Sequence, residues 1–158
     1  MRIGQGWDAH RFGADRPLRL AGVEIPCARG GLVGHSDADV LSHATASALL
    51  GSLSLGDLGQ HFPEDDPRYE GADSMQLLRH VVGLVHERGY AVVNLDSTVV
   101  AEQPRLAAHI GALRGALAAA LQIGRDCVSV QATTAEGMGA LGRAEGIAAH
   151  AVVLIARR

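Results

Sequence analysis

The alternation of apolar and polar positions along the chain predicts strands separated by helices. Residues 2–12 alternate loosely and suit a first strand, while residues 18–20 and 23–25 suit two short strands joined by a tight turn. Three longer segments further along the chain also have the pattern of strands, at residues 90–100, 128–134 and 146–156.

A first helix follows the short strands. The glycine-rich residues 30–34 lead into a segment where Ser36 or Asp37 is a good N-cap and Gly51 is a suitable C-cap. The sequence therefore predicts a helix from about residue 36 to residue 51, directly after a glycine-rich stretch.

Two more helices are predicted in the middle of the chain. Asp73 and Ser74 cap a segment that runs to Gly89, with apolar residues at the helical period at Leu77, Leu78, Val81, Val82 and Val85. Residues 109–122 are rich in alanine and leucine and predict the third helix. Residues 56–67 are rich in Gly, Pro and Asp, which predicts an acidic loop without regular structure.

The order of the long elements is β-α-α-β-α-β-β. This order predicts an α/β sandwich in which helices cover one face of a mixed sheet. No repeat, linker or low-complexity segment divides the chain, and 158 residues is the usual size of one domain. We therefore expect residues 1–158 to form a single domain.

Charge and composition exclude several classes of function. A net charge of −3 gives no basic surface for nucleic acid or for a membrane, and the longest apolar run, residues 147–156, is too short to span a bilayer. All fourteen basic residues are arginine, which excludes Schiff-base lysines and the P-loop lysine. The N-terminus lacks a signal peptide and Cys27 and Cys127 form no disulfide framework, so a cytoplasmic location is expected.

Three residues near the start of the chain suggest a metal site. Asp8 and His10 are two apart in the predicted first strand, so their side chains share one face and can hold one ion. His43 on the first helix would add a third ligand and leave a position open, as in catalytic zinc sites. Manganese and iron are alternatives to zinc. If no metal binds, Asp8 and His10 are an ordinary pair on the surface of a strand, and His43 is a histidine packed on its helix. Asp39, on the helical face of His43, could accept the other ring N–H of that histidine.

Two further segments suggest binding of phosphate groups. His35 lies at the predicted helix start, where backbone N–H groups attract anions, although it could also be an ordinary loop histidine. Thr133, Thr134 and the glycines that follow can approach phosphate oxygens, and Glu136 can hold a hard cation such as Mg²⁺. A simple glycine-rich connection between strands is the alternative for this second segment.

These motifs, taken in order, resemble one family, the 2-C-methyl-D-erythritol 2,4-cyclodiphosphate synthases of the non-mevalonate isoprenoid pathway. The resemblance extends almost from end to end of the chain. It rests on Arg2-Ile3-Gly4, Trp7-Asp8-Ala9-His10, Gly34-His35-Ser36-Asp37 with Asp39 and His43, Leu55-Gly56-Asp57-Leu58-Gly59, Phe62-Pro63, Gly71-Ala72-Asp73-Ser74, Ala132-Thr133-Thr134 with Glu136, Gly142-Arg143 and Glu145-Gly146-Ile147-Ala148.

The resemblance implies a ferredoxin-like α/β sandwich that assembles as a homotrimer with active sites between subunits. It also implies a reaction. The 2-phosphate of 4-diphosphocytidyl-2-C-methyl-D-erythritol 2-phosphate attacks the β-phosphorus of the same molecule, which forms the cyclic diphosphate and releases CMP. Such an intramolecular phosphoryl transfer depends mainly on positioning and on stabilisation of charge.

The resemblance also implies roles for residues near the reacting phosphates. Asp8, His10 and His43 match zinc ligands, and Glu136 matches a ligand of the Mg²⁺ or Mn²⁺ that bridges the α- and β-phosphates. His35 and Thr134 match residues that stabilise the transition state, and all six residues would contact substrate or its metals.

Three further groups follow from the same resemblance. The pocket for the methylerythritol part would be formed by Ser36, Asp57, Leu58, Gly59, Phe62 and Asp66. The cytidine side, across the subunit boundary, would be formed by Ala101, Arg105, Leu106, Ala132 and Thr133. A central cavity of the trimer, where relatives hold isoprenoid diphosphates, would be lined by Trp7, Arg143 and Glu145. Arg143 is also expected to bind the substrate.

The chain departs from the usual pattern of this family in four places. Glu64 and Asp65 stand where the family usually has Asp and Thr in the substrate loop. Arg105 replaces a usual lysine and keeps its charge but not its shape, Ser47 replaces a common aspartate, and Ala140 replaces an aromatic residue near the cavity.

Two other functions remain open from the residues alone. With water as the nucleophile, the same metal ligands would make the chain a zinc phosphohydrolase that gives a linear product. The other alternative is a trimer without catalytic activity, which binds isoprenoid diphosphates through Arg143 and Glu145.

Overall fold

The computed structural model describes residues 1–63 and 65–158. Within these ranges, five strands form a mixed sheet in the order β4-β1-β7-β5-β6, and two short strands form a separate hairpin. The strands of the sheet are β1 (Arg2–Ala14), β4 (Gly31–Leu32), β5 (Tyr90–Val100), β6 (Val128–Thr133) and β7 (Gly146–Arg157), and those of the hairpin are β2 (Leu18–Leu20) and β3 (Val23–Ile25). Only the β5–β6 pair of the main sheet is parallel.

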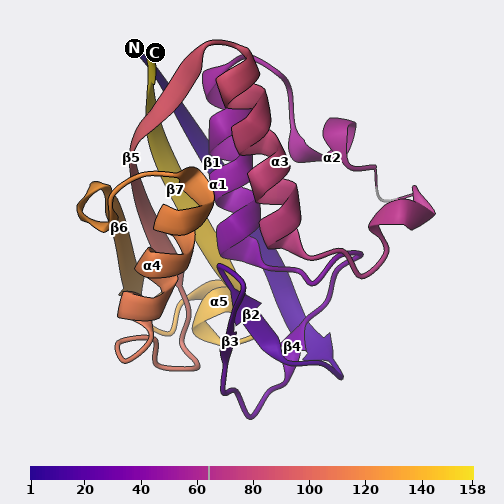
Figure 1. Ribbon diagram of the computed structural model, residues 1–158. Helices are drawn as coiled ribbons and strands as arrows, with labels where there is room; N and C mark the ends of the chain where they lie inside the picture. Colours follow the sequence, from indigo (N-terminus) through magenta and orange to yellow (C-terminus); the bar gives the residue numbers. More distant parts are fainter. Residues whose placement is uncertain (64) are drawn as a thin grey trace.

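The long helices lie on one face of this sheet (Figure 1). They are α1 (Val40–Ser52), α3 (Ser74–Glu87) and α4 (Ile110–Leu121). The core between the layers is formed by apolar side chains of these helices and by alternate residues of the strands, such as Ala149, Val153 and Ile155 of β7. The expected α/β sandwich with helices on one face of a mixed sheet is therefore confirmed.

The other face of the sheet carries exposed apolar side chains. Ile3 and Trp7 of β1 are 70% and 62% exposed, and Val93 of β5 is 39% exposed. The long helices α1, α3 and α4 all lie on the opposite face (Figure 1). The sheet thus has one buried face and one open, partly apolar face.

Strand β1 and helix α1 are in direct backbone contact. A Cβ atom added at Gly4 would lie 2.0 Å from the carbonyl oxygen of Ala48, and one at Gly6 would lie 2.1 Å from that of Ala44. Glycine at two alternate positions therefore lets the helix lie directly on the strand. Side chains at the next alternate positions, Asp8 and His10, consequently reach the first turn of α1.

The structure corrects the predicted boundaries of the first helix. Helix α1 begins at Val40 with Asp39 as its N-cap, not at Ser36 or Asp37, because the Asp39 carboxylate accepts a hydrogen bond from Ser42 N. The same carboxylate accepts from Ala21 N and Gly22 N at the turn between β2 and β3, which ties the hairpin to the helix.

The end of α1, the loop after it and the two later helices differ from the prediction in two places and agree in two. The C-cap of α1 is Leu53 instead of Gly51, because the chain stays helical through the glycine to Ser52. Residues 56–67 contain α2 (Leu58–His61) and the first residue of the 3₁₀ helix η1 (Pro67–Tyr69), so the prediction of no regular structure there is wrong. The N-cap at Asp73 and the extent of α4 are confirmed to within one residue.

Candidate metal centre

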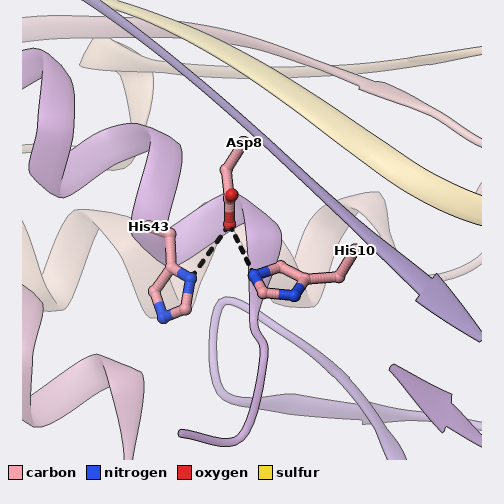
Figure 2. Close-up of side chains that lie close together, drawn as sticks. All are labelled: Asp8, His10 and His43. Carbon is pink, nitrogen blue, oxygen red and sulfur yellow. Dashed lines mark hydrogen bonds and ion pairs between the residues drawn. The ribbon is translucent and has the colours of Figure 1, made fainter. Parts of the chain in front are cut away.

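Asp8, His10 and His43 converge on one point between β1 and α1 (Figure 2). The Asp8 Oδ2 atom lies 2.9 Å from His43 Nδ1 and 3.2 Å from His10 Nε2, and one ligand atom from each residue lies within 4.8 Å of the other two. The three side chains are only 12–25% exposed. The predicted cluster of candidate metal ligands is thus confirmed.

Hydrogen bonds on the far side of each imidazole assign which nitrogen carries the proton. His10 Nδ1 lies 2.6 Å from the carbonyl oxygen of Val33, which can only accept, so Nδ1 donates and Nε2 presents its lone pair to the cluster. His43 Nε2 lies 2.7 Å from Ser74 Oγ, and the Ser74 hydroxyl donates to Asp37. His43 Nε2 therefore donates to Ser74, and Nδ1 presents its lone pair to the cluster.

This arrangement fits a bound cation. Two imidazole lone pairs and a carboxylate oxygen all face the same point, and their mutual repulsion is relieved only by a metal ion or by added protons. With a proton on the cluster-facing nitrogen of each imidazole in place of a cation, burial still opposes ionisation of Asp8, but hydrogen bonds and positive charge from His10 and His43 outweigh burial and hold the pKa of Asp8 well below its usual range. Asp8 is therefore ionised when positive charge lies at this point.

The sequence prediction for the partner of His43 is wrong. Asp39 was expected to accept the second ring N–H, but its buried carboxylate is occupied by Ser42 and by the β2–β3 turn. Ser74 and Asp37 take this role instead. No signal in the sequence links Ser74 to His43, since the two residues are 31 positions apart and Ser74 also begins α3.

A cavity of about 400 Å³ opens beside the cluster. The predicted site residues that line it are Trp7, Asp8, His10, His35, Ser36, His43, Leu58, Gly59 and Phe62, and its other lining residues are Ala9, Ser47, Tyr69 and Leu77. The structure therefore brings most of the expected methylerythritol pocket next to the metal ligands. Trp7, which was expected at a trimer cavity, also lines this cavity, as do four residues that the sequence assigned to no site.

The environment of His35 differs from the one expected. His35 lies four residues before the N-cap of α1, and the Asp39 carboxylate occupies the helix N-terminus. The prediction that this N-terminus assists His35 in binding an anion is therefore wrong. His35 Nε2 lies 3.4 Å from the carbonyl oxygen of Asp66 at the wall of the cavity. Its ring can reach a bound anion from this position without the helix.

The residues expected on the cytidine side lie in a second cavity of about 420 Å³. It is found where the parallel strands β5 and β6 end, and it is lined by Ala101, Glu102, Pro104, Arg105, Leu106, Ala107, Ala132, Thr133 and Thr134. Among the described residues, none lines both cavities. One chain therefore holds the two groups of predicted residues apart.

The structure places five predicted residues in neither cavity. Asp57 caps α2 by accepting from Gln60 N, and the Asp66 carboxylate forms an ion pair with Arg68. Glu136 accepts a hydrogen bond from Thr134 Oγ1 at 3.0 Å, and Arg143 and Glu145 form an exposed ion pair at 2.6 Å. Glu64, a departure in the substrate loop, lies outside the described residues.

Replacing Ser74 with alanine tests the hydrogen bond to His43. We expect the folded variant to bind Zn²⁺ about 10- to 100-fold more weakly, because the His43 ring loses the acceptor that fixes its tautomer. Competition with a chromogenic chelator measures this affinity. Ser54→Ala, at an exposed position distant from the cluster, is the control and should bind as the wild type does. Equal affinity in Ser74→Ala would contradict the assigned role.

The fold and the site together define an enzyme with a metal-binding Asp-His-His cluster between the first strand and the first helix of an α/β sandwich. The chain belongs to the YgbB family, whose model matches residues 1–156. A curated relative from Trichlorobacter lovleyi, 2-C-methyl-D-erythritol 2,4-cyclodiphosphate synthase, is 57% identical over 155 residues and is matched over 98% of each chain.

Solved structures show the same fold. A 2C-methyl-D-erythritol-2,4-cyclodiphosphate synthase in a CDP-bound form has a TM-score of 0.90 and 36% identity, over 98% of this chain and 100% of that one. The bifunctional IspDF from Campylobacter jejuni has a TM-score of 0.95 and 39% identity, over 99% of this chain but 42% of the bifunctional one. In the described part of the chain, no helix has the length and apolar character needed to cross a membrane.

Proposed function

We propose that this chain converts 4-diphosphocytidyl-2-C-methyl-D-erythritol 2-phosphate into 2-C-methyl-D-erythritol 2,4-cyclodiphosphate and CMP in the non-mevalonate isoprenoid pathway. The observation that carries the proposal is the Asp8–His10–His43 cluster at a cavity, in a chain 57% identical to a synthase of this name. A cytoplasmic location and a single domain over residues 1–158 remain predictions that accompany it.

Two imidazole nitrogens and one carboxylate suit Zn²⁺, so Asp8, His10 and His43 would hold a zinc ion. Bound there, the ion would supply Lewis-acid stabilisation of charge on the β-phosphate. Glu136, an exposed carboxylate beside Thr134, would hold the Mg²⁺ or Mn²⁺ that accompanies the diphosphate.

The protein's own groups bind the substrate and place its two reacting ends together. His35 would donate to a phosphate oxygen from the wall of the first cavity, and Thr134 would do so from the second once its hydroxyl turns from Glu136 to the substrate. The methylerythritol part would bind among Ser36, Leu58, Gly59 and Phe62 of the first cavity, and Asp57 and Asp66 would join them only by leaving their present partners, Gln60 and Arg68. The 2-phosphate is already an anionic nucleophile, so the reaction needs orientation more than it needs a base.

The cytidine end of the substrate binds in the second cavity, with Ala101, Arg105, Leu106, Ala132 and Thr133. Because the two cavities share no lining residue among the described residues, one substrate is expected to bridge two chains. This separation supports a ferredoxin-like homotrimer with active sites at its interfaces, and the open apolar face of the sheet supports burial of that face. Trp7, Arg143 and Glu145 would then line a central cavity that accepts an isoprenoid diphosphate.

The reaction itself tests the proposal. Purified protein with Zn²⁺ and Mg²⁺ should release CMP from the cytidylylated substrate, and ³¹P NMR should show a cyclic diphosphate. Absence of CMP would refute the proposed function. A linear diphosphate product would instead support the zinc phosphohydrolase, in which water is the nucleophile. Tight binding of geranyl diphosphate without turnover would support the idle trimer.

Mixing two inactive variants tests the shared active site. His43→Ala removes a metal ligand, and Ala132→Trp fills the second cavity. If each site uses one cavity from each of two chains, random mixed trimers made by co-expression should recover about a quarter of wild-type sites. CMP release by the mixture measures the recovery. Activity no higher than that of the separate variants would contradict a shared site.

A further inference from the structure

The connection between β4 and α1 carries three groups that the site uses. The carbonyl oxygen of Val33 accepts from His10 Nδ1, and Ser36 Oγ lies 3.2 Å from His43 Nε2. The ring of His35 lines the cavity. Residues 33–39 have no regular secondary structure, so helix or strand hydrogen bonds do not fix these three groups.

One side chain binds this connection along its length. The Arg16 guanidinium donates to the carbonyl oxygen of Leu32 from Nε at 3.0 Å and from Nη2 at 2.7 Å. It also donates from Nη2 to Gly34 O at 3.3 Å and from Nη1 to Ser36 O at 2.7 Å. Three alternate carbonyl groups therefore point to one planar cation.

The carbonyl groups between them point the other way. Val33 O accepts from His10, and His35 O accepts from Gly71 N at 2.8 Å. Every carbonyl from residue 32 to residue 36 thus has a partner, and the partners alternate between Arg16 and other parts of the chain. A shift of the connection relative to Arg16 would move Val33 O, the His35 ring and Ser36 Oγ together.

The packing leaves little room for such a shift. A Cβ atom added at Gly34 would lie 2.9 Å from His10 Cε1 and 2.9 Å from Ala38 Cβ. One added at Gly31 would lie 2.6 Å from the carbonyl oxygen of Arg16 and 2.9 Å from its Cγ. The connection therefore lies tightly between the Arg16 side chain and the His10 ring.

We propose that Arg16 is a positioning residue, whose guanidinium binds the carbonyls of Leu32, Gly34 and Ser36 and so fixes the groups that orient both metal-binding histidines and His35. Arginine suits this role because its planar fork donates in several fixed directions at once. A lysine ammonium would keep the charge but could not span three carbonyls in this geometry. The effect on turnover rests on the proposed function, whereas the effect on metal binding does not.

Variants of Arg16 test the inference by metal binding. Arg16→Met keeps the length of the side chain without its donors, and we expect Zn²⁺ affinity to fall about 10- to 100-fold by chelator competition. The visible spectrum of the Co²⁺-substituted variant should change, because the two imidazoles are no longer held in one orientation. Amide hydrogen exchange of residues 33–38 in the metal-free protein should become faster.

Two further variants make the result decisive. Arg16→Lys keeps the charge and is expected to fold, yet to bind Zn²⁺ more weakly than the wild type and to lose kcat more than KM. Arg19→Met, at an exposed arginine on β2 whose nearest carboxylate, Glu24, is 4.0 Å away, is the matched control and should behave as the wild type. Folded Arg16 variants with wild-type zinc affinity and an unchanged Co²⁺ spectrum would overturn the proposal, as would wild-type affinity in Arg16→Lys if Arg16→Met fails to fold.

The two proposals can fail separately. If the wild type binds zinc but releases no CMP, the proposed function is wrong, while the effect of Arg16 on zinc affinity is still measured. If the wild type is an active synthase and the Arg16 variants keep its zinc affinity, only the role of Arg16 is wrong.

Discussion

Replacing His43 with alanine should abolish metal retention and lower kcat/KM by about a thousandfold or more, while the protein stays folded. His43 Nδ1 is one of three ligand atoms, and loss of metal-based charge stabilisation of about 4 kcal/mol corresponds to that factor. Helix α1 keeps its N-cap at Asp39, so its fold does not depend on the imidazole. Elemental analysis of the purified variant measures metal content, and circular dichroism measures folding.

His86→Ala is the matched control for this prediction. His86 lies in the last turn of α3 and belongs to neither cavity, so its removal should leave zinc content and activity unchanged. Full zinc occupancy in folded His43→Ala would show that His43 is not a ligand. Loss of the fold in His43→Ala would instead contradict the expectation that the fold of α1 does not depend on the imidazole.

Replacing Gly6 with alanine should destabilise the protein by about 3 kcal/mol or more, which is a large effect for one methyl group. The added Cβ atom would lie 2.1 Å from the carbonyl oxygen of Ala44 and 2.7 Å from Ala48 N, both in the backbone of α1. Strand and helix must therefore separate, and the movement carries Asp8 away from His43. Urea unfolding of the metal-free protein measures the loss in the free energy of unfolding.

Gly83→Ala provides a control of opposite sign. Gly83 lies within α3, and a Cβ atom there would meet nothing within 4 Å, so alanine should stabilise the helix by about 1 kcal/mol. Equal effects of the two substitutions would show that close contact between β1 and α1 does not limit stability. Zinc affinity should fall in Gly6→Ala and stay unchanged in Gly83→Ala.

The sequence predicts the elements of this fold well where the signals are local. Alternation places the long strands, and Asp73 and the alanine-rich segment place α3 and α4. The start of α1 is missed because Ser36, Asp37 and Asp39 are all suitable caps. Hydrogen bonds from Asp39 to Ala21 and Gly22 favour the third of them, and these contacts join residues far apart in the sequence.

The residues of the site, like the helix boundaries, could be predicted from the sequence only where the signal is local. Asp8 and His10 could be paired from the sequence because residues two apart in a strand share a face. The roles of Ser74 and Arg16 could not, because Ser74 reaches His43 across 31 positions and Arg16 binds backbone carbonyls, which are the same for every residue type. The division of the substrate residues between two cavities likewise depends on tertiary structure.

In the proposed reaction, a metal ion held by Asp8, His10 and His43 is required for cyclisation of the substrate. Titration of the metal-free protein with Zn²⁺, in constant Mg²⁺, measures this requirement when CMP release is followed at each addition. We predict that activity is absent at the start, rises linearly and levels off at one zinc ion per chain. Full CMP release before any zinc is added, with no further increase during the titration, would show that cyclisation needs no metal ion at this site.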